Sequence, residues 1–202
     1  MAPERKRTAG YPRSRGADAR GERDRIRIAQ SAARLIAEHG ISDWAHAKRK
    51  AARQLMLPAT APLPSNEEIE QALADYHTLF RADAHAASLR AQRTEALAWM
   101  RQLAAWDPLL VGGVAAGWAT EHSDIHLELV ADDPKPVEIA LAGIGVAYAA
   151  LPPRDDEAAI SLRIATPAAA VRIAIVHPHQ RRNRARRDDE PRLDAAAVAA
   201  LL

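Results

Sequence analysis

The stretch that most constrains the fold is residues 109–133, where two strand-like segments flank a glycine turn. A short apolar run, Leu109-Leu110-Val111, leads directly into Gly112-Gly113. From residue 124 onward, ionisable and apolar residues alternate, in the order Asp124, Ile125, His126, Leu127, Glu128, Leu129. Alternation with a period of two is typical of a strand with one buried face. The stretch therefore predicts two strands joined through a glycine turn and a short helix or loop, with the ionisable side chains on one face of the second strand.

Glycines and carboxylates in this order suit a phosphate ligand and its metal ion. A glycine turn lets backbone N–H groups approach a phosphate closely. Two carboxylates at positions i and i+2 of a strand lie about 6.6 Å apart on one face. Hard oxygen ligands of this kind hold Mg²⁺ on phosphate groups. A phosphate site is therefore expected where the glycine turn meets the second strand.

The residues Gly112-Gly113, the spacer after them and Asp124-Ile125-His126 resemble the core motif of the polymerase-β-like nucleotidyltransferases. In that family a Gly-Gly or Gly-Ser turn precedes Asp-x-Asp on a strand. The resemblance covers residues 97–176 and implies a nucleotidyltransferase-like fold. It also implies that Gly112 and Gly113 hold phosphates, that Asp124 is the first metal carboxylate, and that His126 stands at the second catalytic position.

The sequence departs from this motif at several positions. Val114 stands where the family often has serine, and His126 stands where it has the second aspartate. The family's third carboxylate lies on a later strand, but the later candidate strands here carry Arg163 and Arg172 and no acidic residue. We therefore expect a protein that binds a nucleotide or nucleic acid, with Mg²⁺ as the implied cofactor. Whether it also catalyses metal-dependent nucleotidyl transfer is left open.

Two more residues belong to the candidate site. Ser123 directly precedes Asp124 and is a candidate for cofactor binding, but no glycine elbow surrounds it, so it does not match a hydrolase nucleophile. Glu128 is a candidate metal ligand, although an extended strand places it about 13 Å from Asp124, too far to share one ion with it. Asp124 and His126 can share a divalent metal.

Composition narrows the class of protein. The chain has 202 residues, enough for one domain plus an appendage. Its net charge is only +2, so the chain is not basic overall. Its basic residues gather near the two ends. The lack of cysteine excludes a disulfide framework and a thiolate zinc site. There is no long apolar run and no signal peptide, so a cytoplasmic protein without membrane partners is expected.

The N-terminal part of the chain suggests a different activity. Residues 23–39 and 44–55 have helical spacing of apolar residues, and together they resemble the first two helices of a Tet-repressor-type helix-turn-helix domain. A proline-rich linker and an acidic helix that begins at Ser65 follow, where a recognition helix is expected. The alternative function is thus a helical DNA- or RNA-binding regulator that uses the basic helix 44–55. The competing interpretation is a helical hairpin whose basic face is solvated or pairs with the acidic helix.

The expected fold class is α+β, with N-terminal helices followed by a small mixed β-sheet that has helices on one face. The third helix should bury Ile69, Leu73, Tyr76 and Phe80, and His77 and His85 are interpreted as surface or hydrogen-bonded histidines rather than ligands. The later strands, 159–165 and 170–176, should form an antiparallel hairpin. The expected divisions are a disordered basic tail (1–22), a helical region (23–96), a nucleotidyltransferase-like domain (97–179), and a charged linker with a short closing helix (180–202).

Overall fold

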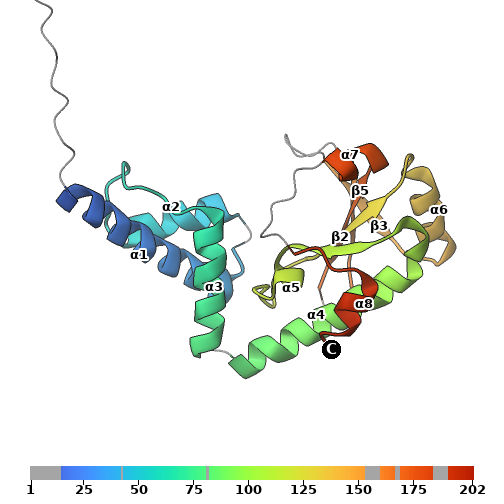
Figure 1. Cartoon of the computed structure of the whole chain (residues 1–202), viewed down its shortest axis with the longest axis horizontal. Coiled ribbons are helices and arrows are strands. Elements are labelled where there is room, and N and C mark those ends of the chain that lie inside the picture. Colours follow the sequence, from blue (N-terminus) through green and yellow to red (C-terminus); the bar gives the residue numbers. More distant parts are fainter. Residues whose placement is uncertain (1–14, 42, 81, 153–159, 167–168, 184–190) are drawn as a thin grey trace, which may run out of the picture.

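The computed structural model describes residues 15–41, 43–80, 82–152, 160–166, 169–183 and 191–202. They form an α+β structure in which N-terminal helices precede a five-stranded mixed sheet with helices packed against it (Figure 1). The helices are α1 (Arg15–His39), α2 (Trp44–Gln54), α3 (Asn66–Phe80), α4 (Ala82–Gln102), the 3-10 turn η1 (Ala104–Trp106), α5 (Gly112–Ala116), α6 (Lys135–Gly143), α7 (Pro178–Asn183) and α8 (Ala195–Ala199). The strands are β1 (Leu109–Val111), β2 (Ile125–Val130), β3 (Tyr148–Leu151), β4 (Ile160–Ile164) and β5 (Val171–Val176).

Helices α1, α2 and α3 pack into a helical lobe (Figure 1). Ile28, Ile69 and Leu73 are fully buried at its centre, and alanines of α1 and α2 fill much of the rest. Because α1 begins at Arg15, the expectation of a disordered tail is wrong for residues 15–22, which are helical. Alanine, arginine and glutamate all favour helices, which explains the extension. Residues 1–14 lie outside the described residues.

The two helix starts predicted in this lobe are confirmed. The Asp43 carboxylate accepts a hydrogen bond from the His46 N–H at 3.0 Å. The Glu68 N–H donates to Ser65 Oγ at 3.2 Å, and the Ser65 N–H donates to Glu68 Oε2 at 2.7 Å, which is a complete capping box. The predicted apolar stripe of α3 is wrong at its end, because Phe80 is 71% exposed. The Phe80 ring contacts the Tyr76 ring, with centroids 5.2 Å apart, at the end of α3 that extends beyond the helical lobe (Figure 1).

The sheet has the strand order β1-β2-β5-β4-β3, with β2 and β5 parallel and the other pairs antiparallel. The predicted neighbours β1 and β2 lie side by side, with Val111 opposite His126. The predicted hairpin of β4 and β5 is confirmed, and its register places Arg163 opposite Arg172. The strand pairs on which the candidate site depends are therefore present.

The two faces of the sheet differ in what covers them. The apolar face, which includes Ile125, Leu127 and Leu129, is fully buried in one cluster with residues of α4, α6 and α8. Helix α7 lies on the other, polar face, where its Arg181 reaches Glu128 of β2. The expectation of helices on one face only is therefore wrong for this short helix. The sequence did not predict α7, because ion pairs hold this helix on the sheet and ion pairs give no apolar residues at helical spacing.

The C-terminal segment belongs to the sheet lobe. Leu193 and Leu110 exchange two backbone hydrogen bonds, of 2.8 and 2.9 Å, so the segment extends the sheet beside β1. The predicted closing helix is present as α8, whose Val198 is fully buried in the core. Residues 184–190 of the predicted charged linker lie outside the described residues. None of the described helices has the length and hydropathy needed to cross a membrane.

Candidate functional site

The predicted site lies at the end of the sheet where β1 stops and β2 begins. Gly112 directly follows β1 and adopts φ +69°, a left-handed conformation that favours glycine. A Cβ atom at Gly112 would lie 3.9 Å from the His126 side chain. The structure thus places Gly112, the first glycine of the turn, beside His126 of the Asp-x-His motif.

Gly113 has a different local role. A Cβ atom built at this residue would lie 2.6 Å from the Trp118 ring, a distance that real Cβ contacts do not show. The indole also packs against Trp44 of α2, with ring centroids 5.1 Å apart. Gly113 is therefore required by the packing of Trp118, which the glycine motif in the sequence did not reveal.

Ser123 forms part of the turn that positions Asp124. Its Oγ accepts a hydrogen bond from the Thr120 N–H at 3.0 Å and lies 3.2 Å from Thr120 Oγ1. Its carbonyl oxygen accepts from Gln92 Nε2 of α4 at 3.3 Å. The Ser123 hydroxyl, predicted to bind a cofactor, thus has protein partners within its own turn.

Asp124 lies beside an arginine. Its side chain is 33% exposed, and Oδ1 lies 3.6 Å from an Nη atom of Arg163 on β4. Among the residues whose positions are described, no group of three or more His, Cys, Asp or Glu side chains could hold a metal ion. One half-exposed carboxylate with a guanidinium as neighbour is a poor donor set for Mg²⁺, which prefers several oxygen ligands. The residues present thus do not fit the implied cofactor.

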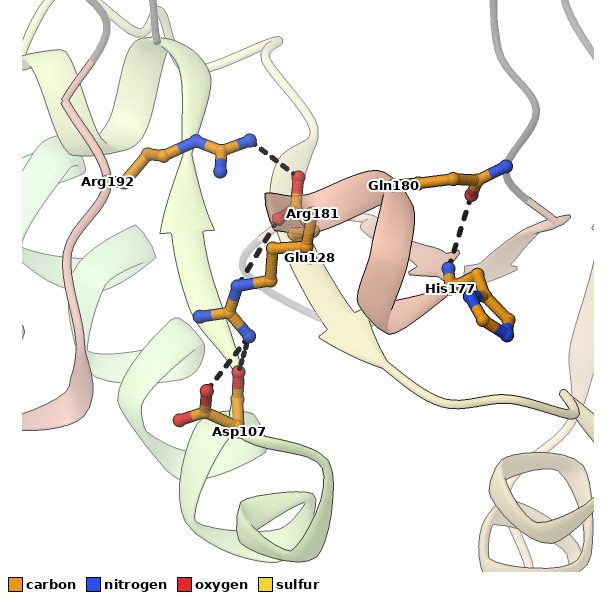
Figure 2. Close-up of polar contacts among 6 residues, drawn as sticks. All are labelled: Asp107, Glu128, His177, Gln180, Arg181 and Arg192. Carbon is orange, nitrogen blue, oxygen red and sulfur yellow. Dashed lines mark hydrogen bonds and ion pairs between the residues drawn. The ribbon is translucent and has the colours of Figure 1, made fainter. Parts of the chain in front are cut away.

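Glu128, the second predicted metal ligand, lies in a network of ion pairs (Figure 2). Its side chain is 3% exposed, and Oε2 accepts a hydrogen bond from Arg192 at 2.8 Å. Arg181 of α7 lies 3.8 Å from Oε1, and it also donates to the carboxylate and carbonyl oxygens of Asp107. Two arginines from the C-terminal segment therefore surround the carboxylate. The partners are distant in sequence, so residue spacing gave no signal of them.

Three further residues lie on the polar face, on strands where the family motif has its second and third carboxylates. His126 is opposite Arg172, and Arg172 is opposite Arg163, in three adjacent strands. Their strand neighbours Ile125, Val171 and Leu162 are fully buried, so all three ionisable side chains point to the other face. We call His126, Arg172 and Arg163 the cationic row.

Helix α4 holds the loop before Asp124 in place. Three α4 side chains donate hydrogen bonds to backbone carbonyls of the segment between β1 and β2: His85 to Ala119 (3.0 Å), Gln92 to Thr120 (2.9 Å) and Arg93 to Val114 (3.2 Å). Burial lowers the pKa of His85, and the nearby Arg93 acts in the same direction. The hydrogen bond to Ala119 opposes this shift. The backbone frame of the site is therefore set by α4.

The basic helix of the alternative function, α2, turns part of its charged surface toward α3. Lys48 donates a hydrogen bond to Asn66 Oδ1 at 2.8 Å, and burial lowers its pKa. Arg49 and Arg53 are exposed. Lys48, which belongs to the helix predicted to bind nucleic acid, thus has a partner within the helical lobe.

Comparison with known proteins gives no match to this chain among family models, curated proteins or solved structures. The function is therefore argued from the geometry of the site.

Proposed function

We propose that this protein binds a nucleoside triphosphate through a nucleotidyltransferase-like sheet and does not catalyse metal-dependent transfer. One observation carries the proposal: the Gly112 turn borders His126, and Arg172 and Arg163 follow His126 across the next two strands, at positions where a metal-dependent enzyme needs carboxylates. The turn and the charges suit phosphate groups. The order of a helix, a strand, a glycine turn and a strand supports the nucleotidyltransferase-like part of the proposal.

The surroundings of Asp124 favour binding over chemistry. A two-metal displacement needs carboxylates that hold ions about 3.5–4 Å apart on the attacking and leaving oxygens. In this site the neighbour of Asp124 is Arg163, and the Glu128 carboxylate lies between Arg181 and Arg192. The guanidinium groups can neutralise phosphate charge directly, so nucleotide binding needs no metal ion.

The substitution Asp124→Asn tests this proposal. It removes a negative charge that repels phosphate and frees Arg163 for the ligand. Affinity for ATP, measured by titration calorimetry, should rise about twofold to threefold, the effect of one charge about 8 Å away in water. Asp83→Asn, at an exposed position on α4, is the matched control and should leave the affinity unchanged.

If the protein is instead a metal-dependent nucleotidyltransferase, Asp124→Asn should abolish activity, because Asp124 would then hold the metal ion. Pyrophosphate release that depends on Mg²⁺ and disappears in the Asp124→Asn variant would show a transferase. A wild-type protein that binds none of the common nucleoside triphosphates would overturn the proposal altogether.

A further inference from the structure

We propose that the exposed face of helix α2 is a docking surface for the phosphate backbone of double-stranded DNA. The surface lies on the helical lobe rather than on the sheet, so DNA binding there goes beyond the proposed function and does not depend on the nucleotide site. It consists of one imidazole and three cationic side chains at positions i, i+3, i+4 and i+7 of the helix. We call them the basic stripe: His46, Arg49, Lys50 and Arg53.

Helical spacing places the basic stripe on the side of α2 that faces solvent. Residues three, four and seven positions apart lie on one face of an α-helix. The other face consists of three buried alanines that pack in the helical lobe, namely Ala47, Ala51 and Ala52. Within the stripe, Lys50 is half-buried and the other three side chains are exposed. Because α2 contains no acidic residue, its whole solvent-facing side is basic or neutral.

The acidic start of α3 acts on Lys48, which is not part of the stripe. Lys48 donates a hydrogen bond to Asn66 Oδ1 at 2.8 Å. Burial lowers the pKa of Lys48, and the carboxylates of Glu67 and Glu68 oppose this shift, so both lie close enough to act on its charge. Helix α3 therefore compensates the lysine that α2 turns into the helical lobe.

The stripe itself keeps an excess of positive charge. Across the part of the chain that the structure describes, no ion pair is recorded for its three cationic members. Asp43, the residue before α2, is the acidic neighbour recorded for the stripe: the His46 N–H lowers the pKa of its carboxyl most, and the charge of Arg49 adds a smaller effect. One carboxylate thus faces three cations, and like charges at helical spacing repel one another. A polyanion that docks on the stripe relieves this repulsion.

The composition of the surface favours a nucleic acid over a membrane or a protein partner. A helix that lies on a membrane needs large apolar side chains beside its basic face, and a protein interface needs an apolar core. The other residues on the solvent-facing side of α2 are Ala45 and Gln54. Met56, which follows the helix, is a single exposed apolar side chain. Binding to phosphates is mainly electrostatic and needs no apolar core.

The dimensions of α2 suit duplex DNA. An α-helix with its side chains is about 10–12 Å wide, and the major groove of B-DNA is about 12 Å wide. The major groove of duplex RNA is deep and too narrow for side chains to enter. The first and last members of the stripe lie about 10.5 Å apart along the helix axis. Since duplex DNA carries one charge about every 1.7 Å of its axis, the stripe can contact several phosphates at once.

The experiment measures binding of the full chain to a short fluorescent DNA duplex by anisotropy, over a range of salt concentrations. Affinity should fall as salt rises, with about −0.9 in the slope of log K against log salt for each phosphate contact. The triple variant Arg49→Gln, Lys50→Gln, Arg53→Gln should reduce the size of this slope by about 3. At about 0.1 M salt it should bind about a hundredfold more weakly, the effect of three lost phosphate contacts.

The matched control removes the same charge from another surface. Arg90→Gln, Arg101→Gln and Lys135→Gln replace exposed residues of α4 and α6, and this variant should bind DNA within about threefold of the wild-type protein, because distant charges are screened. Glutamine is a good helix former, so both triple variants should fold. The stripe variant should unfold at the wild-type temperature or above, since its like charges no longer repel.

Several results would overturn the docking surface. Equal DNA binding by the two triple variants would place the contact elsewhere on the chain, and wild-type binding that ignores salt, or no binding, would exclude phosphate contacts. Duplex RNA and phosphatidylserine vesicles are the comparison ligands, and stronger binding to either would overturn the assignment to DNA. If the stripe variant does not fold, Arg53→Gln alone takes its place, and an unchanged salt slope in that variant would equally overturn the stripe. ATP affinity should be the same in the stripe variant and the wild-type protein, so the nucleotide site is tested separately.

Discussion

At the scale of single residues, the two glycines of the turn are predicted to respond differently to substitution. Gly113→Ala places a methyl group 2.6 Å from the Trp118 ring, so the indole or the backbone must move. Overpacking of this kind costs about 1–3 kcal/mol. The free energy of unfolding, measured by urea denaturation, should fall by that amount.

Gly143→Ala is the matched control for this prediction. Nothing lies within 4 Å of a Cβ atom at Gly143, and the residue is in the last turn of α6. Its substitution should leave stability unchanged or raise it slightly, since alanine is the better helix former. Equal stability of the Gly113→Ala and Gly143→Ala proteins would show that Trp118 does not need the space at residue 113.

The glycine turn also shows what local sequence can predict about a site. The sequence predicted that Gly112 and His126 belong to one site, because the turn and the alternation of the second strand are both local patterns. The sequence also assigned Gly113 to this site, because residue spacing does not show that the Trp118 ring packs against Gly113. Likewise the sequence identified Arg163 and Arg172 but not the row, because a row across three strands depends on the register of the sheet.

At the scale of elements, Glu128 is predicted to hold the C-terminal segment on the sheet (Figure 2). Glu128→Gln keeps the shape of the side chain but removes the charge that pairs with Arg181 and Arg192. Loss of one member of a buried ionic network is destabilising, and partial exposure of the two arginines reduces the cost to about 1–3 kcal/mol. The exchange of the Leu110 and Leu193 amide hydrogens should become faster, since the segment that pairs with β1 is then held less firmly.

A glutamate outside this network provides the comparison. Glu138→Gln changes a half-buried residue of α6 that has no ion pair recorded among the described residues, and it should leave amide exchange at Leu110 and Leu193 unaltered. If both variants exchange at the wild-type rate, the backbone pairing of Leu193 is sufficient to hold the segment without Glu128.

Elements were predicted best where their signals are local. The helix start at Ser65 and the β4–β5 hairpin follow from neighbouring residues, and both are present. The place of β5 between β2 and β4 was not predicted, because many apolar strands satisfy the same alternation. Helix α7 was missed for a related reason: charged residues fix its place on the polar face, and Arg181 lies far from Glu128 in the sequence.

At the scale of the whole molecule, the helical lobe contacts the loop that leads into the candidate site. A Cβ atom at Gly40, just after α1, would lie 3.0 Å from the His122 ring, and Trp44 of α2 packs on Trp118. The His77 ring of α3 stacks on the His85 ring of α4, with centroids 3.9 Å apart. The helical lobe and the loop before Asp124 therefore share one interface.

This interface is predicted to weaken in acid. The pKa of His85 is lowered, first by burial, so the folded chain takes up its proton at a lower pH than the unfolded chain does. The unfolded imidazole titrates near about pH 6.5. The contribution of His85 to stability is therefore complete above that pH and is lost as the pH falls below it. The nearby Arg93 adds to the cost of charging the ring, on which His77 stacks, and Glu121 lines the same small cavity.

The substitution His85→Gln isolates this effect. A glutamine Nε2 can donate to the Ala119 carbonyl as the imidazole does, but it does not titrate. Between about pH 8 and about pH 5, the free energy of unfolding should fall less in this variant than in the wild-type protein. His46→Gln, at an exposed position on α2, should retain the wild-type dependence. Equal pH dependence in all three proteins would mean that His85 is protonated as readily in the folded chain as in the unfolded one, and that the interface does not respond to acid through this residue.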